Sequence, residues 1–171
     1  EFVYGADYGD ESVQPGGKTV RKGINLSARY QINKWLYSFV NIDLARPEEL
    51  DKPKGNNYLP LAPTFTSTGG LYLDFKNGFN GSISYRYMHN RAANENYSLT
   101  AKGYFITDVS ANYTTKKYEI GLGIENLFNQ SWNEAQFEYV TRLKYETQAV
   151  DEVSNTPGVP FFARLKLSVF F

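Results

Sequence analysis

Hydrophobic residues recur at every second position in several segments of this chain, and this period constrains the fold more than any other feature. In residues 24–32, Ile, Leu, Ala and Tyr alternate with Asn, Ser, Arg and Gln. The same alternation recurs in residues 117–125 and in the last ten residues. Successive side chains of a β-strand point to opposite faces, so each segment predicts a strand with one apolar and one polar face.

Weaker alternation predicts further strands at 36–44, 65–75, 79–87 and 105–113, and a short piece at 1–7 brings the expected number to eight. The connections between them alternate in length. Residues 33–34, 76–78 and 115–116 are short polar turns, whereas 8–22, 46–63, 90–103 and 128–161 are long. Short turns at one end and long loops at the other are typical of outer-membrane barrels. We therefore predict an all-β fold, an antiparallel transmembrane β-barrel.

The composition agrees with a barrel and argues against several other classes of protein. No stretch approaches the ~20 apolar residues of a membrane helix. Lys+Arg and Asp+Glu both number 18, so the charge balance gives no support to nucleic-acid binding. The chain has no cysteine, which excludes disulfides and thiolate metal sites. No cofactor is expected.

Aromatic residues collect where the predicted strands meet the short turns, as in the girdles at membrane interfaces, although aromatics also favour strands in general. They are Tyr30, Trp35, Tyr37, Phe75, Phe79, Tyr113, Tyr118 and Phe171. The polar faces carry charges of both signs. A basic residue facing lipid at the bilayer midplane would cost ~2–4 kcal/mol, whereas a wet or plugged lumen accepts charge readily. These features favour a membrane barrel over a soluble one.

The last predicted strand ends on an aromatic residue. Its apolar face consists of Leu165, Leu167, Val169 and the terminal Phe171, preceded by Ala163. Such an end resembles the signal that the barrel-assembly machinery recognises, and an unpaired strand edge can add to a receptor edge through its free backbone groups. The alternative is an ordinary final strand that ends on phenylalanine.

Four segments resemble the C-terminal part of TonB-dependent outer-membrane receptors: 58–63, 98–104, 124–129 and 156–160. The most specific is the run Asn126-Leu127-Phe128-Asn129, which lies at the outer end of the penultimate predicted strand. The resemblance covers essentially the whole chain.

This resemblance implies a 22-strand barrel in the bacterial outer membrane, with an N-terminal plug and a segment that contacts TonB. Residues 1–171 would then be the C-terminal portion of the barrel, about its last eight strands, without the plug. No export signal precedes Glu1, so we expect a processed chain or a fragment. The implied partners are outer-membrane lipid, the remainder of the barrel and the plug, the barrel-assembly machinery, and TonB through the N-terminal part. The implied function is energy-coupled uptake of a scarce nutrient such as an iron chelate, a vitamin or a glycan.

The longest predicted loop, 128–161, carries residues that could contact an extracellular ligand. They are Trp132, Phe137, Tyr139, Arg142 and Tyr145. The alternative for each of them is a loop that packs on itself and its neighbours.

Residues for catalysis are few, and we do not expect an enzyme. His89 is the only histidine and has no identifiable partner for a metal site or acid–base pair. Glu119 and Glu125 share a face but lie six residues apart, roughly 20 Å along a strand, which is too far for paired carboxylates. Besides the receptor, a complete eight-stranded barrel with a structural or adhesive role remains an alternative, because eight is an allowed barrel number.

Overall fold

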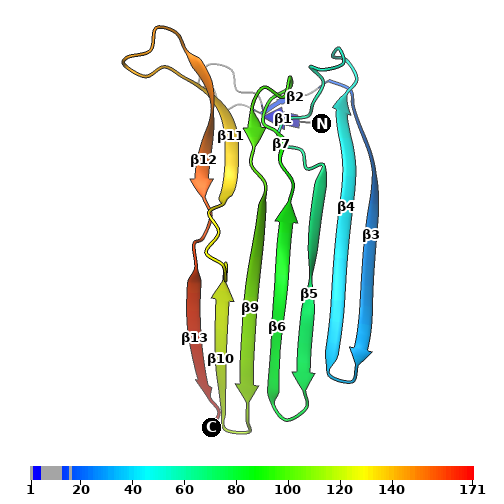
Figure 1. Cartoon of the computed structure of the whole chain (residues 1–171), viewed down its shortest axis with the longest axis vertical. Helices are drawn as coiled ribbons and strands as arrows, with labels where there is room; N and C mark the ends of the chain where they lie inside the picture. The colour runs from blue at the N-terminus through cyan, green and yellow to red at the C-terminus, as the bar shows by residue number, and fades with distance from the viewer. Residues whose placement is uncertain (1, 5–12, 16) are drawn as a thin grey trace.

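The computed structural model describes residues 2–4, 13–15 and 17–171, and most of them form one antiparallel sheet (Figure 1). Its strands are β3 (Thr19–Asn33), β4 (Leu36–Glu49), β5 (Phe65–Phe75), β6 (Phe79–Met88), β9 (Tyr104–Thr114), β10 (Tyr118–Glu125) and β13 (Phe162–Val169). Their order across the sheet is β13-β10-β9-β6-β5-β4-β3. Neighbours in the sheet are neighbours along the chain once the short strands of the loops are set aside. The predicted all-β antiparallel fold is confirmed.

Within the described residues, three smaller hairpins lie outside this sheet. β1 (Phe2–Tyr4) pairs with β2 (Val13–Pro15), β7 (Arg91–Ala92) with β8 (Thr100–Ala101), and β11 (Asn133–Thr141) with β12 (Val150–Pro157). We call the seven-stranded sheet the wall. The strand predicted at 1–7 is therefore not a wall strand, because Phe2–Tyr4 pairs with β2 and residues 5–7 lie outside the described part. In the described residues the main sheet has seven strands rather than eight.

The two ends of the sheet differ as predicted. The short connections all lie at the end where the C-terminus lies, and the long connections lie at the opposite end (Figure 1). Each short turn contains a side chain that accepts a backbone N–H two residues further on. The pairs are Asn33 with Trp35 at 3.0 Å, Asn77 with Phe79 at 3.1 Å, and Thr115 with Lys117 at 3.2 Å. These local bonds explain why short polar segments suffice to reverse the chain.

The register separates an apolar face from a polar one across all seven strands. One apolar row runs through Ile83, Val109, Ile124 and Ala163, and a polar row runs through Asn25, Asp43 and Thr66. The alternation read from the sequence is thus confirmed. Tyr37 is an exception to the expected aromatic girdle, since it pairs with Gln31 and Tyr72 on the polar face.

Hydrogen bonds between neighbouring strands satisfy much of the polar face. The bonded pairs are Asn25 with Asp43, Asn41 with Thr68 at 3.2 Å, Ser82 with Ser110 at 2.8 Å, Asn80 with Asn112 at 3.1 Å, and Glu119 with Lys166 at 3.0 Å. On the apolar face the strands present Leu, Ile, Val and aromatic side chains that are exposed in the chain by itself. This division fits a wall with lipid on one side and polar surroundings on the other.

Buried side chains concentrate at the end of the sheet that carries the long connections. The apolar part of this core consists of Leu59, Ala62, Ala92, Ala93 and Ala101 from the long connections and of Ile106 from the start of β9. Within the described residues, no helix has the length and apolar character needed to cross a membrane.

Candidate ligand-binding region

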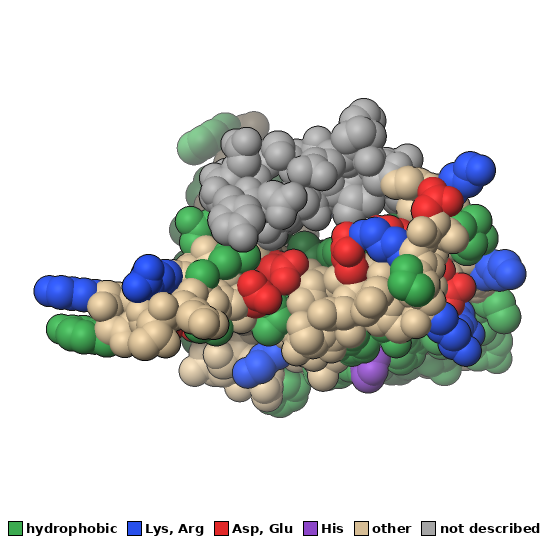
Figure 2. Space-filling model, turned by 90° about the horizontal axis from the view of Figure 1, so that it is seen from above, with side chains coloured by type: hydrophobic (Ala, Val, Ile, Leu, Met, Phe, Trp, Pro, Cys, Tyr) green, Lys and Arg blue, Asp and Glu red, His purple; other side chains and the backbone are tan. Residues whose placement is uncertain are grey.

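Three long connections pack together at this end into what we call the loop layer: residues 50–64, 89–103 and 126–161. Backbone bonds join the first to the second, from Leu61 N–H to the Ala92 carbonyl at 2.8 Å and from Tyr58 N–H to the Glu95 carbonyl at 3.1 Å. Gln136 joins the second to the third, because its amide both accepts from and donates to the Lys102 backbone at 2.8 Å. Seen from above, acidic and basic side chains lie beside one another over this layer (Figure 2).

Asn126 closes the base of the third connection. Its side chain is 2% exposed and its φ is 50°, a left-handed value that asparagine tolerates better than most residues. The Asn126 amide donates to the carbonyls of Gln130 at 2.8 Å and Val159 at 3.1 Å, and its Oδ1 accepts from Gln130 N–H at 2.8 Å. One side chain thus holds both ends of the connection where they leave the wall.

The other residues of the Asn-Leu-Phe-Asn run continue this closure. Asn129, also at a left-handed φ of 49°, accepts a hydrogen bond from Phe161 N–H at 3.0 Å. Leu127 N–H donates to the Thr107 carbonyl at 2.8 Å, which ties the turn to β9. Phe128 is exposed. The run that carries the resemblance has a structural role in this chain.

Trp132 lies beside the polar face of the wall. Its Nε1 donates to the Val159 carbonyl at 3.0 Å, and its ring lies 4.8 Å from the ring of Tyr104. The Arg86 guanidinium is 5.6 Å from the indole centroid and 3.4 Å from the Asp108 carboxylate. The aromatic face of Trp132 and the half-exposed cation of Arg86 therefore meet on the polar face, at the end that carries the long connections. This arrangement suits planar or anionic ligands.

The other four predicted contact residues lie along the β11–β12 hairpin and are not gathered around Trp132. Phe137 and Tyr139 share one face of the hairpin, opposite Ser154 and Glu152. Arg142 donates to the Glu146 carbonyl at 3.1 Å within the tip, and Tyr145 is 91% exposed there. The structure thus separates the predicted set into one residue at the wall and four on the hairpin.

Sequence reasoning missed the partners that come from the wall strands. Arg86 and Asp108 are among the charges of both signs on the predicted polar faces, and Tyr104 is the last residue of the resembling segment 98–104. Their meeting with Trp132 depends on the route of the 126–161 connection, for which the sequence carries no periodic signal.

Ion pairs and burial shift the pKa values of two groups in the loop layer. Burial lowers the pKa of Lys52, but its hydrogen bonds and charge interactions with Glu95 and Glu49 outweigh this, and the net shift is upward. Burial raises the pKa of the Glu138 carboxyl, the hydrogen bond from Asn94 lowers it, and Asp151 and Glu95 raise it further. Lys52 thus links the first two long connections through its ion pairs. Glu138, by contrast, has no cation to balance its charge and lies near other acidic side chains.

The residues considered for metal binding or acid–base catalysis do not lie close to one another. In the described part of the chain no three His, Asp or Glu side chains are grouped so that they could hold a metal ion. His89 Nδ1 lies 3.0 Å from the Tyr87 hydroxyl. Glu119 is engaged by Lys166 at 3.0 Å and Thr114 at 3.2 Å.

Comparison with known proteins identifies this arrangement. The family model described as "TonB dependent receptor-like, beta-barrel" matches residues 2–127. The chain belongs to this family. No curated protein sequence matches it.

Three solved structures that match nearly all of this chain share its fold. The ferric yersiniabactin uptake receptor of Yersinia pestis is 17% identical with a TM-score of 0.68, over 94% of this chain and 25% of that one. The siderophore receptor PiuA of Acinetobacter baumannii is 14% identical with a TM-score of 0.67, over 97% and 23%. A copper transporter, OprC, is 17% identical with a TM-score of 0.64, over 99% and 26%. The chain spans about a quarter of the length of these proteins.

The end of the last wall strand differs slightly from the prediction. Leu165, Leu167 and Val169 lie on the apolar face of β13, opposite Leu122, Ile120 and Tyr118. The strand ends at Val169, so Phe171 lies beyond it, although Phe170 N–H still donates to the Lys117 carbonyl at 2.8 Å. The apolar row of the expected assembly signal is present, and its terminal aromatic follows the strand.

Proposed function

We propose that residues 1–171 form the C-terminal part of the barrel of a receptor in the bacterial outer membrane. The whole receptor would take up a scarce nutrient, such as an iron chelate, a vitamin or a glycan, with energy supplied through TonB. The observation that carries this proposal is the open, two-faced wall with its long connections packed at one end. Membership of the TonB-dependent receptor family supports it.

The directions of the two edge strands support a larger barrel. β3 and β13 run the same way, since six antiparallel steps separate them in the sheet. Joining these edges would require a parallel pair in an otherwise antiparallel wall. A self-closed small barrel with a structural or adhesive role is therefore the weaker alternative, and additional strands from the same receptor are the better partners for both edges.

The polar face next to the long connections supports a role in contacting the nutrient. Trp132, Tyr104 and Arg86 present aromatic and cationic surface beside the lumen of the proposed barrel. Phe137, Tyr139, Arg142 and Tyr145 would lie farther out, on the hairpin. In this proposal the group around Trp132 touches the nutrient and the hairpin residues guide its approach.

The last strand supports assembly by the barrel-assembly machinery. β13 pairs with β10 on one side only, so its outer edge has free backbone groups that can pair with a receptor strand. Leu165, Leu167, Val169 and Phe171 would supply the side chains recognised during insertion into outer-membrane lipid.

An uptake assay tests the proposed function. The gene for the complete receptor is deleted, and accumulation of labelled ferric chelates, cobalamin and oligosaccharides is measured under nutrient limitation. We expect the deletion strain and a TonB-deficient strain to lose accumulation of the same compound. Normal uptake of every compound, together with lost surface adhesion, would favour the structural alternative.

A further inference from the structure

The β11–β12 hairpin continues the last pair of wall strands beyond the Asn126–Asn129 turn. β12 lies directly above β13 at the same edge of the molecule, and both strands run toward the end where the C-terminus lies (Figure 1). β11 pairs with β12 as β10 pairs with β13, antiparallel in both cases. Only residues 158–161 separate β12 from β13. The edge of the wall therefore continues along residues 150–169.

The short stretch between β12 and β13 is held from its inner side. Gly158 N–H donates to the Trp132 carbonyl at 2.9 Å, and Phe161 N–H donates to Asn129 Oδ1 at 3.0 Å. Both acceptors lie in the segment that connects β10 to β11. Among the described residues, no strand pairs with the outer side of β12 or of β13. One backbone edge thus stays open from the wall into the loop layer.

The two sides of the hairpin differ in their contacts. On the β11 side, Gln136 bonds twice to the Lys102 backbone at 2.8 Å, and Glu138 accepts from the Asn94 amide at 3.2 Å. On the other side, every residue of β12 except the half-buried Val153 is exposed. The second long connection therefore covers β11 and leaves β12 open. An open strand edge is a template for a further strand.

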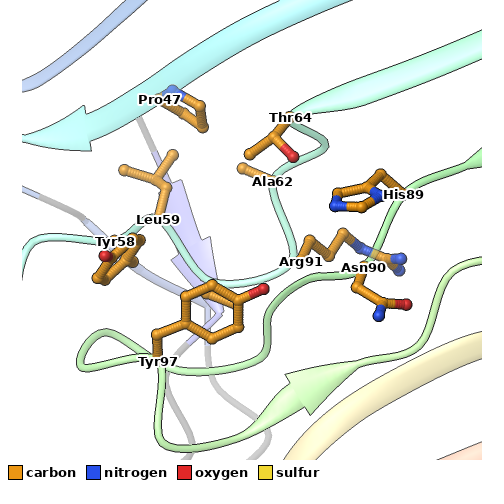
Figure 3. A pocket seen from close by; sticks show the side chains of 10 residues that line it. Pro47, Tyr58, Leu59, Ala62, Thr64, His89, Asn90, Arg91 and Tyr97 are labelled. Carbon is orange, nitrogen blue, oxygen red and sulfur yellow. The ribbon is translucent and has the colours of Figure 1, made fainter.

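At the opposite edge of the wall, strands already continue into the loop layer as a pair. β3 and β4 are 15 and 14 residues long and remain paired up to Thr19 opposite Glu49. There Pro47 of β4 lines a pocket of about 240 Å³ together with Tyr58 and Leu59 of the first long connection (Figure 3). Pairing of wall strands beyond the membrane-spanning part is thus a property that this sheet shows where both partners are present.

We propose that the outer edge of β12 pairs with the same receptor strand that closes the barrel against β13, which we call the closing strand. Because neighbours in this sheet are antiparallel, the closing strand runs along β13 toward the long connections, and its continuation meets β12 next. The partner of β12 is thus an extended segment of the complete receptor, bound through main-chain hydrogen bonds. This inference rests on the proposed receptor barrel and extends its seam into the loop layer.

Such pairing would hold the hairpin from both sides. The second long connection fixes β11 through Gln136, and the closing strand fixes β12. Phe137 and Tyr139, which share one face of the hairpin, then have a fixed position at the rim of the barrel. The hairpin is in this way a rigid continuation of the wall and not a mobile lid over the lumen.

Photo-crosslinking in the complete receptor tests the pairing. The photoreactive residue p-benzoylphenylalanine replaces Ser154 on β12 or Leu165 on β13, and crosslinked peptides are identified by mass spectrometry. Side chains on neighbouring strands lie roughly 5 Å apart, within reach of this group. The control position is Tyr145, which is 91% exposed at the hairpin tip. We expect Leu165 to identify the closing strand and Ser154 to crosslink its continuation at least tenfold more than Tyr145 does.

The two positions separate this inference from the proposed function. Crosslinks from Leu165 to a closing strand, with none from Ser154 to its continuation, would overturn the inference and leave the receptor barrel standing. Crosslinks from both positions that remain within residues 1–171 would overturn both.

Hydrogen exchange of the natural receptor provides a second measurement that needs no substitution. A strand paired on one side bonds alternate N–H groups, so a free β12 edge would exchange rapidly at every second residue. With the closing strand in place, exchange rates of consecutive amides from Asp151 to Thr156 should differ less than tenfold. Residues 109–112 of β9, which pairs on both sides, serve as the reference. Alternating rates in β12 that differ more than tenfold would overturn the pairing.

Discussion

The wall and the loop layer of this chain are built in opposite ways. In the wall, side chains such as Ile24 and Leu165 are 70% and 75% exposed, and regular backbone pairing holds the strands. In the loop layer, residues such as Ala93 and Ala101 are almost fully buried, and side chains such as Asn126 hold backbone segments together. The wall depends on its surroundings for burial, whereas the loop layer buries its own surface.

This difference teaches that the two regions respond to different substitutions. The wall should be sensitive to polarity on its lipid-facing side and tolerant on its polar side. The loop layer should be sensitive to the loss of individual buried hydrogen bonds, as the interior of a soluble protein is.

Asn126→Ala should have the largest effect. It leaves the backbone N–H and carbonyl of Gln130 without a partner and the Val159 carbonyl with only its bond from Trp132 Nε1, and alanine is strained at a φ of 50°. Because each unsatisfied buried group costs ~1–3 kcal/mol, we expect the free energy of local opening to fall by about 3–5 kcal/mol. Hydrogen exchange across residues 126–161 measures it.

Asn133→Ala is the matched control for this substitution. Asn133 bonds to Asn155 at 3.2 Å on an exposed part of the hairpin, so its loss should cost less than about 1 kcal/mol. Equal protection from exchange in Asn126→Ala and Asn133→Ala would show that the base of the connection does not depend on Asn126.

In the wall, Leu122→Lys should cost about 2–4 kcal/mol of folding free energy in a lipid bilayer, because Leu122 lies on the apolar face between Ala111 and Leu165. Ser110→Lys adds the same side chain on the polar face of the neighbouring strand, where only its bond to Ser82 is lost, and should cost less than about 1 kcal/mol. Urea titration of the complete receptor folded into vesicles compares them. A reversed order would mean that the faces are assigned the wrong way round.

The sequence predicted the wall well because one physical rule governs it. Alternation with a period of two assigns residues such as Ile24 and Asn25 to faces, and the turn side chains of Asn33, Asn77 and Thr115 locate the reversals. The piece at 1–7 was too short for that rule. Its pairing with Val13–Pro15 rather than with β3 could not be inferred from period alone.

The loop layer could be predicted only in part, because its contacts are between segments with no periodic pattern. Trp132 was recognised as a candidate, but its neighbours Arg86 and Tyr104 come from strands far away in the sequence. The Asn126–Asn129 run was recognised by resemblance, while its role depends on where Val159 and Phe161 return. The burial of Arg91, which is 9% exposed and forms no ion pair with a described carboxylate, carried no signal in the sequence.

A smaller effect is expected from Gly158→Ala. An added Cβ would lie 2.1 Å from the Trp132 ring, so the indole must move away from the Val159 carbonyl and from Tyr104. Overpacking of this kind costs ~1–3 kcal/mol. Tryptophan fluorescence in a Trp35→Phe background should report the movement. Gly123→Ala, where the added Cβ meets nothing within 4 Å, should leave the emission unchanged; an equal change in both variants would contradict the contact.

The smallest effect should come from Glu138→Gln, which keeps an acceptor for Asn94. Burial raises the pKa of Glu138 above its ordinary 4.5. As pH rises through 4.5, the unfolded state therefore loses its proton first. The free energy of unfolding then falls until the pH has passed the pKa of the folded state. The glutamine variant should therefore match the natural chain below about pH 4 and protect the hairpin more at neutral pH. Because the carboxyl is largely solvated, the gain should be only a few tenths of a kcal/mol.

Hydrogen exchange of β11 at both pH values measures the effect of Glu138→Gln, with Glu134→Gln on the same strand as the control. Lower protection of the glutamine variant at neutral pH would mean that the ionised carboxylate stabilises the loop layer.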